Sequence, residues 1–118
     1  MADIDTFSAW LDGRIGARLD GMNEADLRAE LLMMHRTIKA AEEVGESVAA
    51  LIGMTGANPR KGSVGGRTDL VNELLDVAVS ALGAVEHLCG NDGSSLRRLQ
   101  VRIDGVVTRA GLGEGGSR

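Results

Sequence analysis

The sequence contains very few of the residues that build disulfides, zinc sites and aromatic cores. Cys89 is the only cysteine among 118 residues, so the chain has no internal disulfide and no multi-cysteine zinc site. Phe7 and Trp10 are the only aromatic residues, which means that any core must be aliphatic. Pro59 is the only proline, so the breaks between segments come mainly from 17 glycines.

An excess of positive charge and long apolar runs are also missing. The chain has 13 Lys and Arg against 17 Asp and Glu, a formal net charge of −4, so it lacks the basic field of nucleic-acid-binding proteins. No apolar run approaches the roughly 20 residues of a bilayer-spanning helix. The N-terminal residues lack the basic and apolar regions of a secretory signal. We therefore expect a cytoplasmic protein whose partners include neither a nucleic-acid polymer nor a membrane.

Glycine-rich breaks separate segments that carry a helical pattern. Asn23 is a good N-cap, and apolar residues recur every three to four positions after it, which predicts a helix over about 24–52. A second helix is predicted over 68–89, with a Thr-Asp capping pair at its start and a glycine just after its end. Further helices are predicted over 95–108 and over 4–11. No segment shows the alternation that is typical of a strand.

These segments predict an all-α fold, a helical bundle of two long antiparallel helices joined by a long loop, plus shorter helices. Residues 1–110 are expected to form a single domain, and residues 111–118 a flexible glycine-rich tail. The helix over 68–89 is apolar around about two-thirds of its circumference, more than the other helices of so short a chain can cover. We therefore expect oligomerisation, as a homodimer or a homotetramer, to complete the bundle.

Carboxylates gather at two places on the long helices. Glu43 and Glu46 are three residues apart on one helix face, and Glu73 and Asp76 repeat that spacing on the second helix. If the two helices pair in an antiparallel manner, these four carboxylates converge, with Glu42 beside them. Hard divalent cations with oxygen ligands stabilise such a cluster, which indicates Mg²⁺ or Mn²⁺.

The same spacings are common on solvent-exposed helix faces, which is the alternative interpretation. The second pair of acids differs because it lies on the only polar strip of an otherwise apolar helix. Lys39, one turn before Glu42 and Glu43, neutralises about one of the charges. A di-iron bundle is disfavoured because neither His35 nor His87 follows a glutamate by three positions.

Both acidic segments together resemble a known signature. The run EEVGE at 42–46, followed after a loop by ELLDV at 73–77, resembles the EExxE…ExxD pattern of the MazG-like, all-α nucleoside triphosphate pyrophosphohydrolases. The resemblance covers about residues 31–109. It implies an enzyme that cleaves a nucleoside triphosphate between the α and β phosphates, with Mg²⁺ or Mn²⁺ as cofactor. A phosphoribosyl-ATP-type pyrophosphohydrolase and a non-catalytic helical module for oligomeric interaction or regulation are the alternatives.

The resemblance also implies residue roles. The metal ligands that it implies are Glu43, Glu46, Glu73 and Asp76. It implies that Glu42 binds a further ion or activates water, and the chemistry of the site makes Glu42 or Glu46 the catalytic base. The basic residues that it implies near the substrate phosphates are Lys39, Arg98 and Arg102.

The loop between the long helices carries further basic residues. Arg60, Lys61 and Arg67 lie among glycines whose backbone N–H groups are free, so the loop is a candidate lid over the phosphates. A solvated loop without substrate contact is the alternative. The loop is not a Walker A motif, because no Gly-Lys-Ser/Thr opens the next helix.

Overall fold

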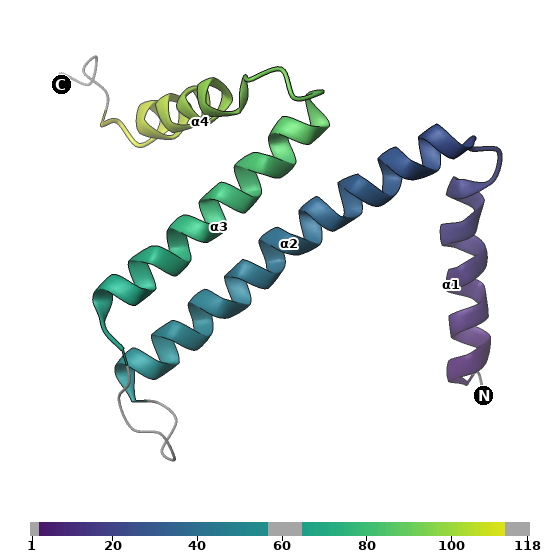
Figure 1. Cartoon of the computed structure of the whole chain (residues 1–118), viewed down its shortest axis with the longest axis horizontal. Coiled ribbons are helices and arrows are strands. Elements are labelled where there is room, and N and C mark those ends of the chain that lie inside the picture. Colours follow the sequence, from purple (N-terminus) through teal and green to yellow (C-terminus); the bar gives the residue numbers. More distant parts are fainter. Residues whose placement is uncertain (1–2, 57–64, 113–118) are drawn as a thin grey trace. The chain divides into compact units, whose positions relative to one another are not determined.

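The structure is a computed structural model that describes residues 3–56 and 65–112, and four helices form in these ranges (Figure 1). The helices are α1 (Ile4–Leu19), α2 (Glu24–Thr55), α3 (Arg67–Leu88) and α4 (Ser95–Arg109). The described residues contain no strand, which confirms the all-α prediction. In these residues no helix combines the length and the hydropathy of a membrane span.

The chain divides into two compact units, Met1–Leu32 and Met33–Arg118, so that α2 begins in the first unit and ends in the second. In the first unit, α1 runs eight residues further than the predicted segment 4–11 and passes through two glycines. A glycine in a helix interior costs about 1 kcal/mol relative to alanine but does not forbid the helix. The helix stops just before Gly21, whose φ of +82° takes the chain out of the helical path.

The ends of the long helices follow the capping signals. The Asp26 N–H donates to Oδ1 of Asn23 over 2.8 Å, which confirms Asn23 as the N-cap of α2. Helix α3 begins one residue earlier than predicted, after Gly66, whose N–H donates to Oδ2 of Asp69 over 2.9 Å. Asp69 therefore acts at the third helical position rather than as part of a capping pair.

The C-terminus of α3 is closed by a glycine, as predicted. Gly90 has a φ of +73°, and its N–H donates to the carbonyl of His87 over 3.1 Å. The Asn91 N–H donates to the carbonyl of Glu86 over 2.7 Å, which completes a Schellman motif. This motif ends the helix and sends the chain into the turn before α4.

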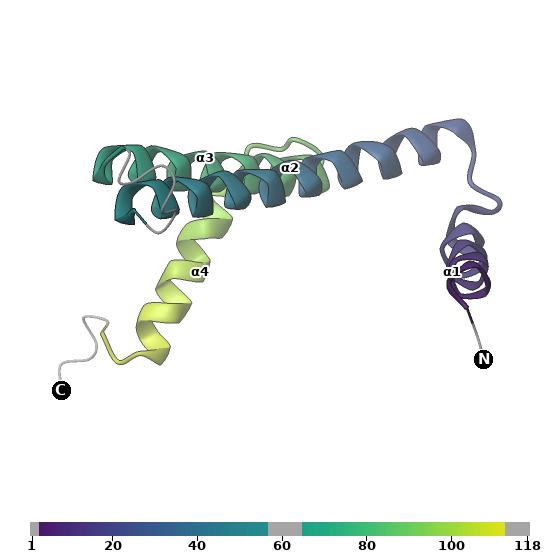
Figure 2. The ribbon, with the colours of Figure 1, turned by 90° about the horizontal axis from the view of Figure 1, so that it is seen from below.

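In the second unit, α3 and the part of α2 from residue 33 onward lie side by side and antiparallel, as both views show (Figures 1 and 2). Their least exposed positions follow a spacing of three and four residues, which is typical of two helices packed along a seam. We call these positions the seam; they are Ala40, Glu43, Ser47 and Ala50 on α2, and Leu70, Glu73, Val77, Ser80 and Ala84 on α3.

Small and polar side chains dominate the seam, so the helices approach each other without a large apolar layer between them. At Gly83 the end of the Arg36 side chain lies against α3, since a Cβ added there would lie 3.1 Å from Nη1 of Arg36. No large apolar side chain is buried anywhere in the described residues, and the buried residues are Glu43, Ser47, Ser94 and Ser95. The hairpin of α2 and α3 therefore encloses its polar residues rather than its apolar ones.

Glu86 fixes the start of α4. Its Oε1 accepts the N–H of Ser95 over 2.7 Å, and its Oε2 accepts the N–H of Gly93 over 2.9 Å. These hydrogen bonds hold the pKa of the Glu86 carboxyl below its usual value, because they favour the ionised form. One side chain near the end of α3 thus satisfies an orphan N–H at the N-terminus of the next helix.

Candidate functional site

The candidate site lies in the seam of the hairpin, where an acid of α2 meets an acid of α3. Glu43 and Glu73 occupy seam positions, and Asp76 follows Glu73 by about one turn. One carboxylate oxygen from each of these three residues lies within 4.8 Å of the other two. The antiparallel pairing of the helices therefore brings the two predicted acidic segments together.

A second group of acids comes from α2 alone. Oxygen atoms of Glu42, Glu43 and Glu46 also lie within 4.8 Å of one another. Glu43 belongs to both groups and joins them, whereas Glu42 and Glu46 are exposed. All five predicted acids thus lie in one region of the hairpin, on and beside the seam.

Lys39 binds the acids of its own helix. Its Nζ lies 2.6 Å from Oε1 of Glu42 and 2.8 Å from Oε1 of Glu43. The side chain of Glu43 is only 9% exposed, so this ammonium group supplies the counter-charge that a buried carboxylate needs. Both carboxylates raise the pKa of Lys39 in turn, and Lys39 remains charged across the whole working range of pH.

Glu73 has no such counter-charge. Its pKa is raised, first because burial penalises the ionised form and then because of the negative charges of Glu46, Asp76 and Glu43. Its Oε2 is buried and has no hydrogen-bond partner in the described part of the chain. A buried carboxylate oxygen without a partner, surrounded by like charges, is costly unless a cation approaches it.

These observations fit a hard divalent cation. The group of Glu43, Glu73 and Asp76 offers oxygen ligands only, from two helices, and one of its carboxylates carries an unpartnered buried oxygen. Mg²⁺ and Mn²⁺ prefer such ligands, whereas the described residues place no histidine or cysteine in the group, as Zn²⁺ or copper sites would require. The residues present therefore fit the cofactor that the sequence predicts.

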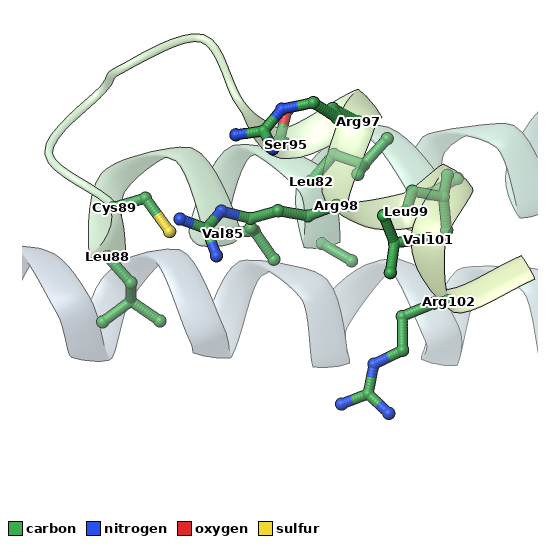
Figure 3. Close-up of a pocket in the computed structure, with 12 residues that line it drawn as sticks. Leu82, Val85, Leu88, Cys89, Ser95, Arg97, Arg98, Leu99, Val101 and Arg102 are labelled. Carbon is green, nitrogen blue, oxygen red and sulfur yellow. The ribbon is translucent and has the colours of Figure 1, made fainter. Parts of the chain in front are cut away.

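The arginines of α4 lie elsewhere. Arg98 and Arg102 line a groove of about 720 Å³ between α3 and α4, together with apolar residues of α3 such as Leu82 and Val85. Figure 3 shows Arg98 directed toward Val85 and Cys89, and Arg102 directed away from them. In the described residues, neither arginine forms an ion pair with the acids.

Arg98 also has a local structural partner. Its Nε donates to Oγ of Ser94 over 2.8 Å, in the turn that Glu86 holds. The structure therefore brings Lys39 to the acids but places Arg98 and Arg102 in the groove. Arg60 and Lys61 lie outside the described residues, as does most of the predicted tail.

The sequence pattern did not indicate which acids are buried. It placed Glu43 and Glu46 together on one helix face, whereas Glu43 is buried at the seam and Glu46 is exposed. The signal was present in the spacing of small residues, because Ala40, Ser47 and Ala50 repeat with Glu43 at intervals of three and four. A search for large apolar residues alone could not find this seam.

Comparisons of the chain with protein-family models, with curated proteins and with solved structures find no match. The description of the chain therefore rests on its own fold and site. These define an all-α protein with a cluster of carboxylates between two antiparallel helices.

Proposed function

We propose that the chain is a Mg²⁺-dependent nucleoside triphosphate pyrophosphohydrolase, which cleaves the substrate to a nucleoside monophosphate and pyrophosphate. The observation that supports it best is the meeting of Glu43, Glu73 and Asp76 around a buried oxygen of Glu73 without a partner. The MazG-like pattern of acids in the sequence supports the reaction, and the convergence of carboxylate oxygens from α2 and α3 supports a cation among them.

Glu43, Glu46, Glu73 and Asp76 would hold Mg²⁺, or Mn²⁺ in its place. A bound divalent cation neutralises the charge that develops on the phosphate oxygens and makes a bound water more acidic. Without a cation these carboxylates repel a triphosphate, so the proposed activity is expected to depend strictly on the metal. Lys39 pairs with both Glu42 and Glu43 and offsets about one of their two charges from the side of α2.

Glu46 is the better candidate for the catalytic base. An oxygen of Glu42 already accepts the ammonium group of Lys39 at 2.6 Å, whereas Glu46 forms no ion pair in the described residues. Glu46 would accept a proton from the attacking water while an oxygen–phosphorus bond forms at the α phosphorus. The bond between the α phosphorus and the oxygen that bridges it to the β phosphorus would break, and pyrophosphate would leave with that oxygen and the electron pair.

A panel of ribo- and deoxyribonucleoside triphosphates with Mg²⁺, scored for pyrophosphate release, tests the proposal. We expect turnover of at least one substrate, and loss of at least about 100-fold in Asp76→Asn, which removes a charged ligand. Asp12→Asn in the first unit is the matched control, because Asp12 is exposed and remote in sequence from the acids. Absence of pyrophosphate with every substrate, or equal turnover in Asp76→Asn, contradicts the proposal.

A second candidate function is a non-catalytic helical module for oligomeric assembly. The observation that favours it is the exposure of large apolar side chains along both long helices, among them Val48 at 49% and Leu74 at 52%. Such a module associates without using the acids. Association that persists in Asp76→Asn, in a chain that releases no pyrophosphate, would support this second candidate over the first.

A further inference from the structure

The groove between α3 and α4 is a second candidate site, because none of its lining residues belongs to the acids of the seam. Its volume of about 720 Å³ falls within the range of roughly 300–1,000 Å³ that is typical of small-molecule sites. The wall that α3 provides extends over residues 78–89, and α4 provides the other wall with residues 95–102. At about 1.5 Å per residue, the α3 wall is about 16 Å long.

The surface of the groove is mainly aliphatic. The α3 side chains that line it recur at intervals of three and four residues, so they lie along one face of the helix. Ala78 and Ala81 have small side chains that leave room for a ligand, and Leu82 and Val85 are half-buried. The lining residues include no aromatic ring and no amide side chain with which to recognise a nucleobase. This lining suits an alkyl chain better than a planar polar ring.

The charges of the groove are all positive. Arg97, Arg98 and Arg102 line it and no acid does, although the whole chain has a net charge of −4. In the part of the chain that the structure describes, none of these arginines forms an ion pair. The pKa of Asp92 is lowered by hydrogen bonds from Ser94 and, to a smaller extent, by the charge of Arg98. Asp92 therefore offsets only part of the positive potential, and the groove complements an anion.

Arg98 is the arginine placed to bind an anionic head group. Figure 3 shows its side chain directed toward Val85 and Cys89, at one end of the aliphatic wall. Its Nε donates to Oγ of Ser94 over 2.8 Å, which leaves the two Nη groups for a ligand. A guanidinium group binds a carboxylate through two parallel hydrogen bonds, and its weak hydration suits a position beside an apolar surface.

We propose that the groove between α3 and α4 binds a free fatty acid, with the carboxylate on the guanidinium of Arg98 and the alkyl chain along the α3 wall. The single negative head group matches the one arginine that Figure 3 shows directed toward the wall. The chain covers apolar side chains that are otherwise accessible, such as Leu88 at 61%. The proposal does not depend on the proposed catalytic function, because it uses none of the acids in the seam.

Cys89 provides a reporter that is specific to this groove. It lines the groove, it is half-buried, and it is the only cysteine of the chain. The rate of its alkylation by iodoacetamide therefore measures access to the groove, and fatty acid bound to other apolar surfaces leaves that rate unchanged. We expect dodecanoate, kept below the concentration at which it forms micelles, to slow alkylation at least about tenfold with saturation. Decanoate is expected to bind at least about fivefold more weakly, because each buried methylene contributes roughly a factor of four.

Three further compounds separate the head group from the chain. Dodecan-1-ol and dodecyltrimethylammonium carry the chain without a negative charge, whereas ATP carries negative charge without the chain. We expect each of them to protect the thiol at least about tenfold more weakly than dodecanoate does. Equal protection by the alcohol or the ammonium compound would overturn the proposal, and so would protection by ATP alone. Alkylation that slows as the protein is concentrated, without an effect of dodecanoate, would also overturn it and would indicate a second copy in the groove.

Variants of α4 test the residue assignment, with calorimetric titration of dodecanoate as the measurement. Arg98→Gln removes the positive charge and is expected to weaken binding at least about tenfold. Arg109→Gln is the matched control on the same helix, because Arg109 does not line the groove. Its affinity is expected to equal that of the wild type. Equal affinity in Arg98→Gln and the wild type, or no binding by the wild type, would contradict the proposal.

Arg98→Lys distinguishes the loss of charge from a disturbed turn. This variant keeps a positive charge but loses the Nε that donates to Ser94. We expect it to bind dodecanoate more tightly than dodecan-1-ol, whereas Arg98→Gln binds the two compounds with similar affinity. If Arg98→Lys fails to distinguish them as well, Arg98 acts through the turn, and the proposed contact with the carboxylate is wrong.

Discussion

Among single residues, Glu73 is the one whose buried carboxylate oxygen has no hydrogen-bond partner in the described part of the chain. It lies in the seam, its Oε2 has no partner, and Glu46, Asp76 and Glu43 surround it with negative charge. Lys39 offsets about one of the charges of Glu42 and Glu43, but the described residues supply no ion-pair partner to Glu73. Carboxyl groups whose pKa is raised by burial and by like charges cluster at functional sites, which makes Glu73 a candidate site residue.

The destabilising effect of the ionised Glu73 carboxylate gives a prediction for the stability of the metal-free protein. The raised pKa of Glu73 means that the folded chain binds its proton more tightly than the unfolded chain. Above the raised pKa, the ionised Glu73 carboxylate destabilises the fold by its full amount. This destabilisation decreases as the pH falls and is absent below the ordinary pKa of glutamate. Glu73→Gln is expected to raise the thermal midpoint at pH 8 in chelator, and to change it little at a pH below the ordinary value for glutamate.

Unfolding followed by circular dichroism at the two pH values measures this difference. Asp12→Asn provides the control for the loss of one negative charge. Its thermal midpoint is expected to equal that of the wild type at both pH values. A lower midpoint for Glu73→Gln at pH 8 would show that the ionised carboxylate stabilises the metal-free chain, contrary to the account.

At the scale of helices, glycines at different backbone positions have opposite effects. Gly90 has a φ of +73° in the motif that ends α3, whereas Gly13 lies inside α1 with open space where a Cβ would be. Gly90→Ala is expected to destabilise the protein by about 1 kcal/mol, because an L side chain is strained at positive φ. Gly13→Ala is expected to stabilise α1 by up to about 1 kcal/mol.

Urea unfolding of both variants checks the two signs. The two glycines lie in different compact units. If the unfolding transitions of the two units occur at different urea concentrations, each transition is analysed separately. Equal effects of the two substitutions would contradict the assignment of Gly90 as the cap of α3.

The helices were largely predictable from the sequence because local signals define them. The N-cap Asn23, the closing Gly90 and the period of apolar residues placed α2, α3 and α4 within a few residues of their bounds. The full length of α1 was not predicted, because Gly13 and Gly16 resemble helix breaks in the sequence. The helical propensity of the other residues in α1 offsets the small cost of these two glycines.

The pairing of the helices was harder to predict than the helices themselves. The meeting of the acidic segments follows from antiparallel pairing, and the structure has that pairing. Which face of each helix meets the other depends on small residues of the seam, whose pattern is weak beside that of the large apolar residues. The positions of Arg98 and Arg102 depend on the turn that Glu86 organises, and no local pattern in the sequence signals that long-range hydrogen bond.

In the second unit as a whole, polar residues lie inside the hairpin and large apolar residues lie outside it. The seam keeps carboxylates from two helices close together. Under the proposed function, a cation bound between the helices stabilises this unit. Chelation of the metal is therefore expected to lower the thermal midpoint.

Binding of Mn²⁺ at pH 8, followed by electron paramagnetic resonance of the free ion, tests the central claim most directly. The claim is that acids from α2 and α3 form one cation site. We predict saturable binding by the wild type, at least about tenfold weaker binding by Glu73→Gln and by Glu43→Gln, and wild-type binding by Asp12→Asn. Equal affinity in all four proteins, or no binding by the wild type, would contradict the claim.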